Sequence, residues 1–460
     1  MLPRTLDPIP ASELSLWGLR SLTSLDPRLS IEATSNGLQL RLAGRLVAFG
    51  PISGADDPLA WGMAISQLCR AAWDTSEGVR RAGNAGILQL FLNEILSHFD
   101  PYSRYAPPSE ALEEKIRRNG RRSLGFDISF QRRGIFVSDV ISGSSAWKAG
   151  IRQGDQILKV NKKIIIANNL IDFANFFDGS GSSLVHFSLI TEGAPPREVE
   201  IQIPSYNPQA VFFSRDGDTL NIRISGFVRD TAANLESGIL SAIKVRFPPK
   251  IMVIDLRGNR GGLLREAVAG VNTLSQGGII VKTTGRDPAS QSEYIASGND
   301  LSRGLPIIII VDGNTASSAE VFAAALADQG RAVVVGSATL GKGLVQTILP
   351  LENRGALSLT WSRLQAPQGW PLQTLGVIPQ ICTNVTEADL KLSLIELSKG
   401  QLTMVDALIK SRNARAPINN ENALNIRNQC PASNGHKLDD LAVRALIGSP
   451  SSYRNALLKY

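Results

Sequence analysis

Two short apolar runs frame one candidate helix, and this pattern restricts the fold more than any other part of the chain. One run is Ile307 to Val311 and the other is Arg331 to Val335. Runs this short, bounded by turn residues, indicate buried strands. Between them, Val321 to Asp328 has helix-forming composition and ends at Gln329-Gly330. Strands and helices alternate in this way from residue 220 to residue 345, which predicts an α/β sheet covered by helices.

A serine and a lysine occupy the two loops of this unit. Ser317 lies where the first strand turns into the helix, and Lys342 follows 25 residues later. None of the histidines, His98, His186 and His436, has an Asp/Ser setting that resembles a triad. Serine–lysine pairs are an established variant of serine catalysis, so Lys342 is the candidate base for a nucleophilic Ser317. Backbone N–H groups at the helix start can stabilise an oxyanion.

A lysine that acts as a base must be neutral. An unperturbed lysine has a pKa of ~10.4, so about one in 2,500 is neutral at pH 7. Lowering that value by roughly three units takes ~4 kcal/mol of differential solvation. Val333 to Val335, Leu340, Leu344 and Val345 are predicted to supply the burial. Gln346, four residues after the lysine, is expected to orient the amine.

Two structural alternatives require no chemistry at all. Thr315 or Ser317 can cap the helix, with Glu320 completing a capping box. Lys342 can be a surface lysine in a glycine turn.

A phosphate-binding loop is a third alternative, because Gly336 and Gly341-Lys342 have the spacing of its first half. Two features argue against it. Gly343 stands where a Mg²⁺-binding hydroxyl is needed, and Leu344 to Pro350 is rich in β-forming residues, whereas such a loop must open a helix.

The phrases Asn314 to Glu320, Asp328 to Ala332 and Gly341 to Gln346 together resemble the carboxyl-terminal processing proteases, also called tail-specific proteases. The resemblance implies a serine endopeptidase with Ser317 as nucleophile, Lys342 as base and Gln346 as the orienting group. The family usually has alanine after the nucleophile, where this chain has Ser318. The spacing of 25 residues to the lysine favours Ser317 over its neighbour.

A glycine loop further upstream carries a second part of the resemblance. Ile251 to Arg257 reads as a buried strand, and the loop Gly258 to Leu264 follows it, with Arg260 in place of the family's usual proline. The resemblance implies that Gly261 and Gly262 donate to the oxyanion together with the amide of Ser318. The alternative is a helix-start loop without a catalytic role.

Residues 123 to about 204 resemble a PDZ domain. Ser123 to Phe126 matches the carboxylate-binding loop at three of four positions, and Gly143 to Asn161 matches the central PDZ phrase. The resemblance implies a groove that binds an apolar C-terminal tail by adding it to a sheet edge. The groove residues are expected on one strand, Leu124, Gly125, Phe126 and Ile128, and on one helix, Leu170, Phe173 and Phe177. The alternative is that these side chains belong to the domain core.

Composition narrows the class of partner. The net charge is +7 over 460 residues, without blocks of basic residues interleaved with aromatics, so nucleic acid is not expected. The basic net charge has two explanations: a solvated surface, which is favoured, and peripheral binding to an anionic membrane, which is kept as an alternative. No metal-ligand spacing occurs, and the resemblance implies neither a metal nor an organic cofactor.

The compartment is not decided by the residues alone. No apolar run reaches about 18 residues, and the first 30 residues lack a signal-peptide core. The chain is then either cytoplasmic or begins after a removed signal. The resemblance favours the second, in the periplasm or another extracytoplasmic compartment. Cys382 and Cys430 can form a disulfide there, but their sequence separation is weak support.

The expected fold class is a multidomain α/β protein. It comprises a mainly helical N-terminal region (1–114), a PDZ domain (115–204), an α/β crotonase-like protease core (205–385) and a helical C-terminal extension (386–460). In the first part, helices are predicted at Glu13–Leu25, Ala60–Trp73 and Glu77–Phe99, with a hairpin at Leu29–Leu42 that turns at Asn36-Gly37.

Other function classes compete with the peptidase. A catalytically silent adaptor would bind protein tails without cutting them, and an acyl-CoA enzyme would use a similar α/β core with glycine-rich oxyanion loops. The Ser, Lys and Gln spacing argues against the first, and the PDZ phrase against the second. The C-terminal extension is expected to dock against the core or against another subunit in a homo-oligomer.

Overall fold

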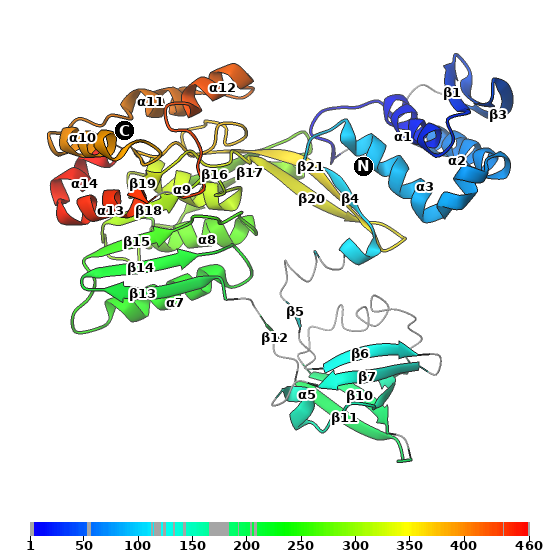
Figure 1. Ribbon diagram of the computed structural model, residues 1–460, viewed down its shortest axis with the longest axis horizontal. Coiled ribbons are helices and arrows are strands. Elements are labelled where there is room, and N and C mark those ends of the chain that lie inside the picture. Colours follow the sequence, from blue (N-terminus) through cyan, green and yellow to red (C-terminus); the bar gives the residue numbers. More distant parts are fainter. Residues whose placement is uncertain are drawn as a thin grey trace.

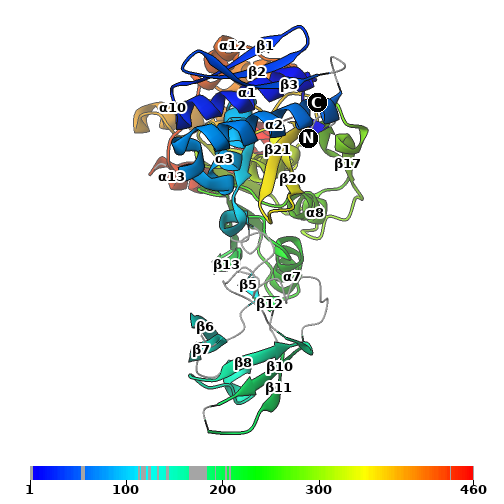
Figure 2. The same ribbon diagram turned by 90° about the vertical axis from the view of Figure 1, so that its right-hand side faces the viewer.

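The computed structural model describes residues 4–52, 57–111, 114, 121–122, 126–131, 134–140, 144–164, 184–191, 193–202, 205–206, 209–435 and 437–458. The α/β core and the C-terminal helices lie together, and a long two-stranded arm connects them to the N-terminal helices (Figure 1). Both views place the PDZ strands away from the core, beyond the short β5–β12 pair (Figure 2).

The N-terminal region packs three helices against a small antiparallel sheet. Its predicted helices are confirmed, but the sheet has a third strand that the prediction lacked. The predicted hairpin is confirmed with its turn one residue earlier, because Thr34 pairs with Gly37. The elements are α1 (Ala11–Leu25), β1 (Leu29–Thr34), β2 (Gly37–Leu42), β3 (Arg45–Pro51), α2 (Pro58–Thr75) and α3 (Glu77–Ser97).

The PDZ region is an antiparallel sheet in the order β11-β10-β8-β7-β6, with β9 paired to β8. An apolar cluster that includes Phe126, Val137 and Phe187 forms its core. The elements are β6 (Phe126–Gln131), β7 (Gly134–Val140), α5 (Ser145–Lys148), β8 (Gln156–Val160), β9 (Lys163–Ile164), β10 (Leu184–Ile190) and β11 (Arg197–Gln202). At the base of the domain, β5 (Arg121–Arg122) pairs with β12 (Ser205–Tyr206).

The core sheet has the order β13-β14-β15-β18-β19-β22. All neighbouring pairs are parallel except β13 with β14. Helices between parallel strands explain this arrangement, because such strands need a crossover connection. The elements are β13 (Val211–Asp216), β14 (Thr219–Ile224), α7 (Thr231–Ile243), β15 (Ile251–Asp255), α8 (Leu264–Leu274), β18 (Ile307–Val311), α9 (Ser318–Asp328), β19 (Ala332–Gly336) and β22 (Ile381–Cys382).

Helices cover both faces of this sheet, which explains why its strands are apolar at every position. Ile307 and Ile309 pack with the α7, α8 and α9 residues, whereas Ile308 and Ile310 pack with the C-terminal helices. Alternate side chains of a strand point to opposite faces, so a strand buried on both sides shows no polar alternation. The expected α/β class is therefore confirmed.

A second sheet forms the arm, in the order β17-β16-β21-β20, with β4 paired to β21. This pairing brings the end of the N-terminal region onto the protease core, because β4 precedes the PDZ domain in the chain. The elements are β4 (Arg104–Ala106), β16 (Gly278–Thr284), β17 (Ser292–Ala296), β20 (Leu344–Pro350) and β21 (Ala356–Gln365).

The C-terminal extension docks against the core, as one of the two expectations had it. Cys382 and Cys430 are joined by a disulfide, with their Cα atoms 5.7 Å apart. From Cys430 on, the chain lies against the loops that follow β18 and β19, where Gly313 N donates to Ser433 O at 2.7 Å and Ala338 N to Cys430 O at 3.3 Å. The helices are α10 (Glu387–Ser398), α11 (Val405–Asn413), α12 (Asn420–Arg427), α13 (Leu438–Gly448) and α14 (Pro450–Ala456).

Two searches of the described residues bear on partners. No helix among them combines the length and the hydropathy needed to cross a bilayer. No group of three or more His, Cys, Asp or Glu side chains among them could hold a metal ion.

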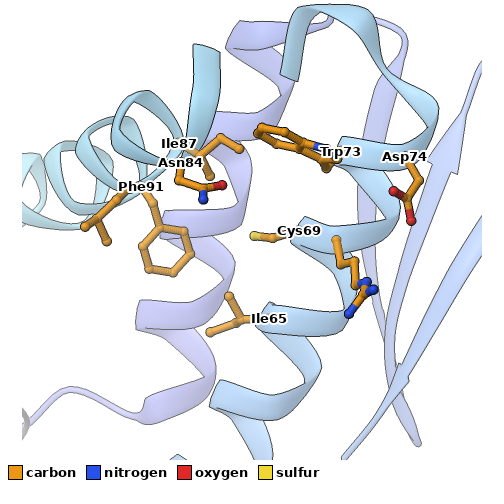
Figure 3. Close-up of a pocket in the computed structure, with 9 residues that line it drawn as sticks. Ile65, Cys69, Trp73, Asp74, Asn84, Ile87 and Phe91 are labelled. Carbon is orange, nitrogen blue, oxygen red and sulfur yellow. The ribbon is translucent and has the colours of Figure 1, made fainter. Parts of the chain in front are cut away.

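A pocket of about 690 Å³ lies between α2 and α3. Cys69, Trp73 and Phe91 point into it (Figure 3). Burial raises the pKa of the Cys69 thiol to about 11, so this thiol is neutral at physiological pH. Helices α2 and α3, which line this pocket, are on the far side of the arm from α9 (Figure 1).

Candidate active site

Ser317 occupies a strained turn between β18 and α9. Its φ of 58° and ψ of −123° are unusual for a residue with a side chain. A sharp strand-to-helix turn of this kind is where serine hydrolases expose a nucleophilic hydroxyl. The turn is held by Asp312, whose Oδ1 accepts from Asn314 N at 3.0 Å and from Thr315 N at 2.9 Å. The backbone strain is therefore fixed by neighbouring hydrogen bonds.

Glu320 links the serine loop to the lysine loop. Its carboxylate is fully buried. Oε2 accepts from Ser317 N at 2.8 Å and from Lys342 N at 2.9 Å, and Oε1 accepts from Gly341 N at 2.7 Å and from the Thr339 hydroxyl. Burial raises the pKa of Glu320, and these four donors oppose that rise. Because both amide nitrogens, of residues 317 and 342, donate to the same oxygen, their separation cannot exceed the two hydrogen-bond lengths of 2.8 and 2.9 Å added together.

The capping alternative is realised in part, because Ser317 is the N-cap residue and its amide donates to Glu320. Glu320 does more than cap the helix, since three of its four donors come from the lysine loop. The phosphate-loop alternative is wrong, because β20 and not a helix follows Lys342.

Lys342 is half-buried, and the ring that covers its amine was not predicted. Its Nζ lies 4.7 Å from the centroid of the Tyr102 ring. Leu340, expected to bury the amine, is instead 43% exposed. Tyr102 comes from the segment that follows α3, more than 200 residues upstream, and no local spacing connects it with the lysine.

Gln346 lies on β20 and is anchored to the neighbouring strand. Its Nε2 donates to Leu344 O at 3.2 Å and to Thr360 Oγ1 at 3.1 Å. Thr360 Oγ1 in turn donates to Asp100 Oδ1 at 2.9 Å. The glutamine is therefore part of a polar chain that begins beside Tyr102.

The glycine loop after β15 lies directly against Ser317. A Cβ on Gly261, whose φ is +88°, would lie 2.7 Å from Ala316 O and 2.9 Å from Ser317 Cβ. The amide of Gly261 donates to Asn259 Oδ1 at 2.8 Å. Arg260, at the usual proline position, donates to Asn314 Oδ1 at 3.1 Å, which ties this loop to the serine loop.

Two amides next to the residues just described, Ser318 after Ser317 and Gly262 after Gly261, have no acceptor among the described residues. Within the described part of the chain, no carbonyl or side chain accepts from the amide of Gly262 or from that of Ser318. The Ser318 hydroxyl is also buried without a hydrogen-bond partner. Unpaired donors at a helix start beside a strained serine are suited to binding an oxyanion.

We expect Gly261→Ala to lower kcat/KM by about 100-fold or more, because the new methyl group pushes Ser317 out of place. Gly258→Ala is the matched control. Gly258 also has a positive φ, of +73°, but a Cβ there would meet no atom within 4 Å. Both variants carry backbone strain of about 1 kcal/mol. Equal losses of activity in the two variants would show that crowding at Ser317 is not the cause.

The PDZ residues are only partly placed. Phe126 is buried in the domain core, with its ring centroid 5.6 Å from that of Phe187, as the core alternative had it. Ile128 is half-buried on β6, the last strand of the sheet. Leu124 and Gly125, and the helix candidates Leu170, Phe173 and Phe177, lie outside the described residues.

Comparisons with known proteins assign the chain to a family. Residues 218–383 match the model of peptidase family S41, and residues 114–189 match that of the PDZ domain. A carboxy-terminal-processing protease of Bartonella bacilliformis is 31% identical over 300 residues, which cover 64% of this chain and 69% of that protein. A probable CtpA-like serine protease of Staphylococcus aureus is 31% identical over 287 residues, or 61% of this chain and 57% of that protein.

Among solved structures, a photosystem II D1 C-terminal processing protease covers 80% of this chain and 92% of its own, at 24% identity and a TM-score of 0.41. The fold and the family models define a serine peptidase that carries a PDZ domain. The chain belongs to the carboxy-terminal-processing proteases of peptidase family S41.

Proposed function

We propose that Ser317 and Lys342 form the catalytic dyad of this serine peptidase. One observation carries the proposal: a single carboxylate oxygen of Glu320 accepts from the backbone amides of both residues. Two loops far apart in the sequence are thereby held together at the start of a helix. Ser317 is half-buried, so a substrate can reach it.

In the first half of the reaction, neutral Lys342 takes the proton from Ser317 Oγ as that oxygen attacks the scissile carbonyl carbon. The C=O bond becomes a C–O⁻ bond, and the oxyanion needs donors. We assign these to the unpaired amides of Gly262 and Ser318. Gly261, whose amide is already paired with Asn259, has the different role of leaving room for the serine.

The oxyanion then collapses and the C–N bond breaks. The ammonium of Lys342 gives its proton to the departing amine, which leaves an ester on Ser317. Lys342, neutral again, takes a proton from a water molecule that attacks this ester. As this second intermediate collapses, the ammonium of Lys342 returns the proton to Ser317 Oγ, the ester C–O bond breaks, and the second product leaves with a free carboxyl group. Gln346 would steady the lysine strand through its bonds to Leu344 and Thr360.

The PDZ domain supplies substrate selection in this proposal. An apolar C-terminal tail would add to β6, which has a strand neighbour on only one side among the described strands. Backbone hydrogen bonds then give affinity, and side-chain pockets give specificity. Cleavage would take place near the tail that is bound, so the substrates are proteins with apolar C-termini.

We also propose the division into residues 1–114, 115–204, 205–385 and 386–460, which the matched ranges 114–189 and 218–383 support. The disulfide between Cys382 and Cys430 supports our proposal of an extracytoplasmic location, because disulfides persist in oxidising compartments.

A fluorophosphonate probe tests the assignment of the nucleophile. The probe phosphorylates an activated serine hydroxyl and releases fluoride. We expect mass spectrometry to find the label on Ser317 in the wild type and in Ser318→Ala, and no label in Ser317→Ala. Ser318→Ala is the matched control, because it keeps the backbone amide at position 318. A label on residue 318, or labelling that survives Ser317→Ala, would contradict the assignment.

A further inference from the structure

The ring of Tyr102 covers the amine of the candidate base. Lys342 Nζ lies 4.7 Å from the ring centroid, within the range of a cation–π interaction. The peptidase chemistry proposed above gives this ring no role. The ring comes from a different region of the chain than the loops that hold the serine and the lysine.

The backbone around Tyr102 is fixed by a compact set of hydrogen bonds. Asp100 Oδ1 accepts from Tyr102 N at 2.8 Å, and Asp100 Oδ2 accepts from Ser103 Oγ at 2.6 Å. Ser103 Oγ accepts from Thr360 N at 3.0 Å, and Arg104 pairs with Ser358. The turn is thereby attached to β21, whose partner β20 starts two residues after Lys342. The backbone that carries the ring is therefore fixed beside Lys342.

Two carboxylates on different elements act on this ring: Asp100 on its own turn and Glu320 on α9. Arg427 on α12 in turn interacts electrostatically with Glu320. Burial, and then the charges of Glu320 and Asp100, raise the pKa of Tyr102. The phenol therefore stays neutral through the physiological range, and its ring keeps the electron-rich face that attracts a cation.

We propose that Tyr102 is a positioning residue whose ring holds the amine of Lys342 and sets the pH at which the protease becomes active. The proposal rests on the dyad described above. A ring face attracts the ammonium and not the neutral amine, so it favours the charged form. The ring therefore makes the lysine release its proton at a higher pH than an aliphatic side chain of similar size would.

The test compares Tyr102→Leu with Tyr102→Phe. Leucine keeps an apolar side chain against the amine but has no ring, whereas phenylalanine keeps the ring and loses only the hydroxyl. With an unstructured protein substrate, we expect the acidic limb of kcat/KM in Tyr102→Leu to move to lower pH by about 0.5 to 1.5 units. In Tyr102→Phe it should stay in place. An unchanged limb in Tyr102→Leu, or equal shifts in both variants, would overturn the proposal.

Fluorinated phenylalanines at position 102 give a second test that does not depend on the fold tolerating leucine. Fluorine withdraws electrons from the ring face and changes its size little, so the limb should move to lower pH as fluorines are added. If the acidic limb of the kcat/KM profile stays at the same pH whatever the number of fluorines, the proposal is overturned. The Lys342→Met variant distinguishes an error about Tyr102 from an error about the dyad. If Lys342→Met is inactive and substitutions at position 102 do not move the acidic limb, only the role of Tyr102 is wrong.

Discussion

Lys342→Met is expected to lower kcat/KM by about 10⁴-fold or more while leaving the fold and the binding of tails intact. Methionine has similar length and no basic nitrogen, so Ser317 would have to attack without a group to take its proton. General-base catalysis contributes about 10²–10⁴-fold, and members of a catalytic unit often cost more when removed. The measurement is kcat/KM on an unstructured protein substrate, with circular dichroism to confirm the fold.

Lys342→Arg is the control that separates a base from a mere positive charge. A guanidinium keeps the charge but does not lose its proton in proteins, so it cannot serve as a base. Both variants should therefore be inactive. Activity near the wild-type level in Lys342→Arg would mean that position 342 acts only through its charge.

Glu320→Gln is expected to lower kcat/KM by about 100-fold. Each carboxylate oxygen accepts from two donors. A glutamine must place its NH₂ group on one side, where it cannot accept from a backbone amide. Either Ser317 and Lys342 lose their shared acceptor, or Gly341 loses its own, because the Thr339 hydroxyl can turn and accept from the NH₂ group.

The cost of this change has two components. Leaving buried donors unpaired costs about 1–3 kcal/mol each, although removing a buried charge offsets part of that loss. A displacement of the dyad by about 1 Å is enough for the expected loss of activity.

Urea unfolding and kcat/KM should be measured together. Glu266→Gln is the control, because Glu266 accepts one backbone amide, from Ala232, and should lose far less. Equal losses in the two variants would refute the linking role of Glu320.

The sequence predicted most of the core because its signals there are local. The runs Ile307–Val311 and Arg331–Val335 lie in strands buried on both faces, and such strands are apolar at every position. The turn residues after each run marked where the loops begin. The candidate serine, lysine and glutamine were named from their order and spacing together with the resemblance to the processing proteases, so no coordinates were needed.

What the sequence could not predict depends on contacts between distant segments. Tyr102 reaches Lys342 only because β4 pairs with β21, and the chain passes through a whole PDZ domain between those strands. The engagement of the Gly261 amide by Asn259 depends on side-chain direction within one loop. Residue spacing also could not predict that the segment from Cys430 to Ser433 contacts the loops that contain Gly313 and Ala338.

The most direct test of the account is the rate at which the fluorophosphonate probe labels Ser317 as a function of pH. If a neutral lysine activates the serine, the rate should rise with a single midpoint near neutral pH, well below the ~10.4 of an unperturbed lysine. The same rise should be absent from Lys342→Met. A midpoint near 10, or an unchanged profile in Lys342→Met, would contradict the claim that Lys342 is the base.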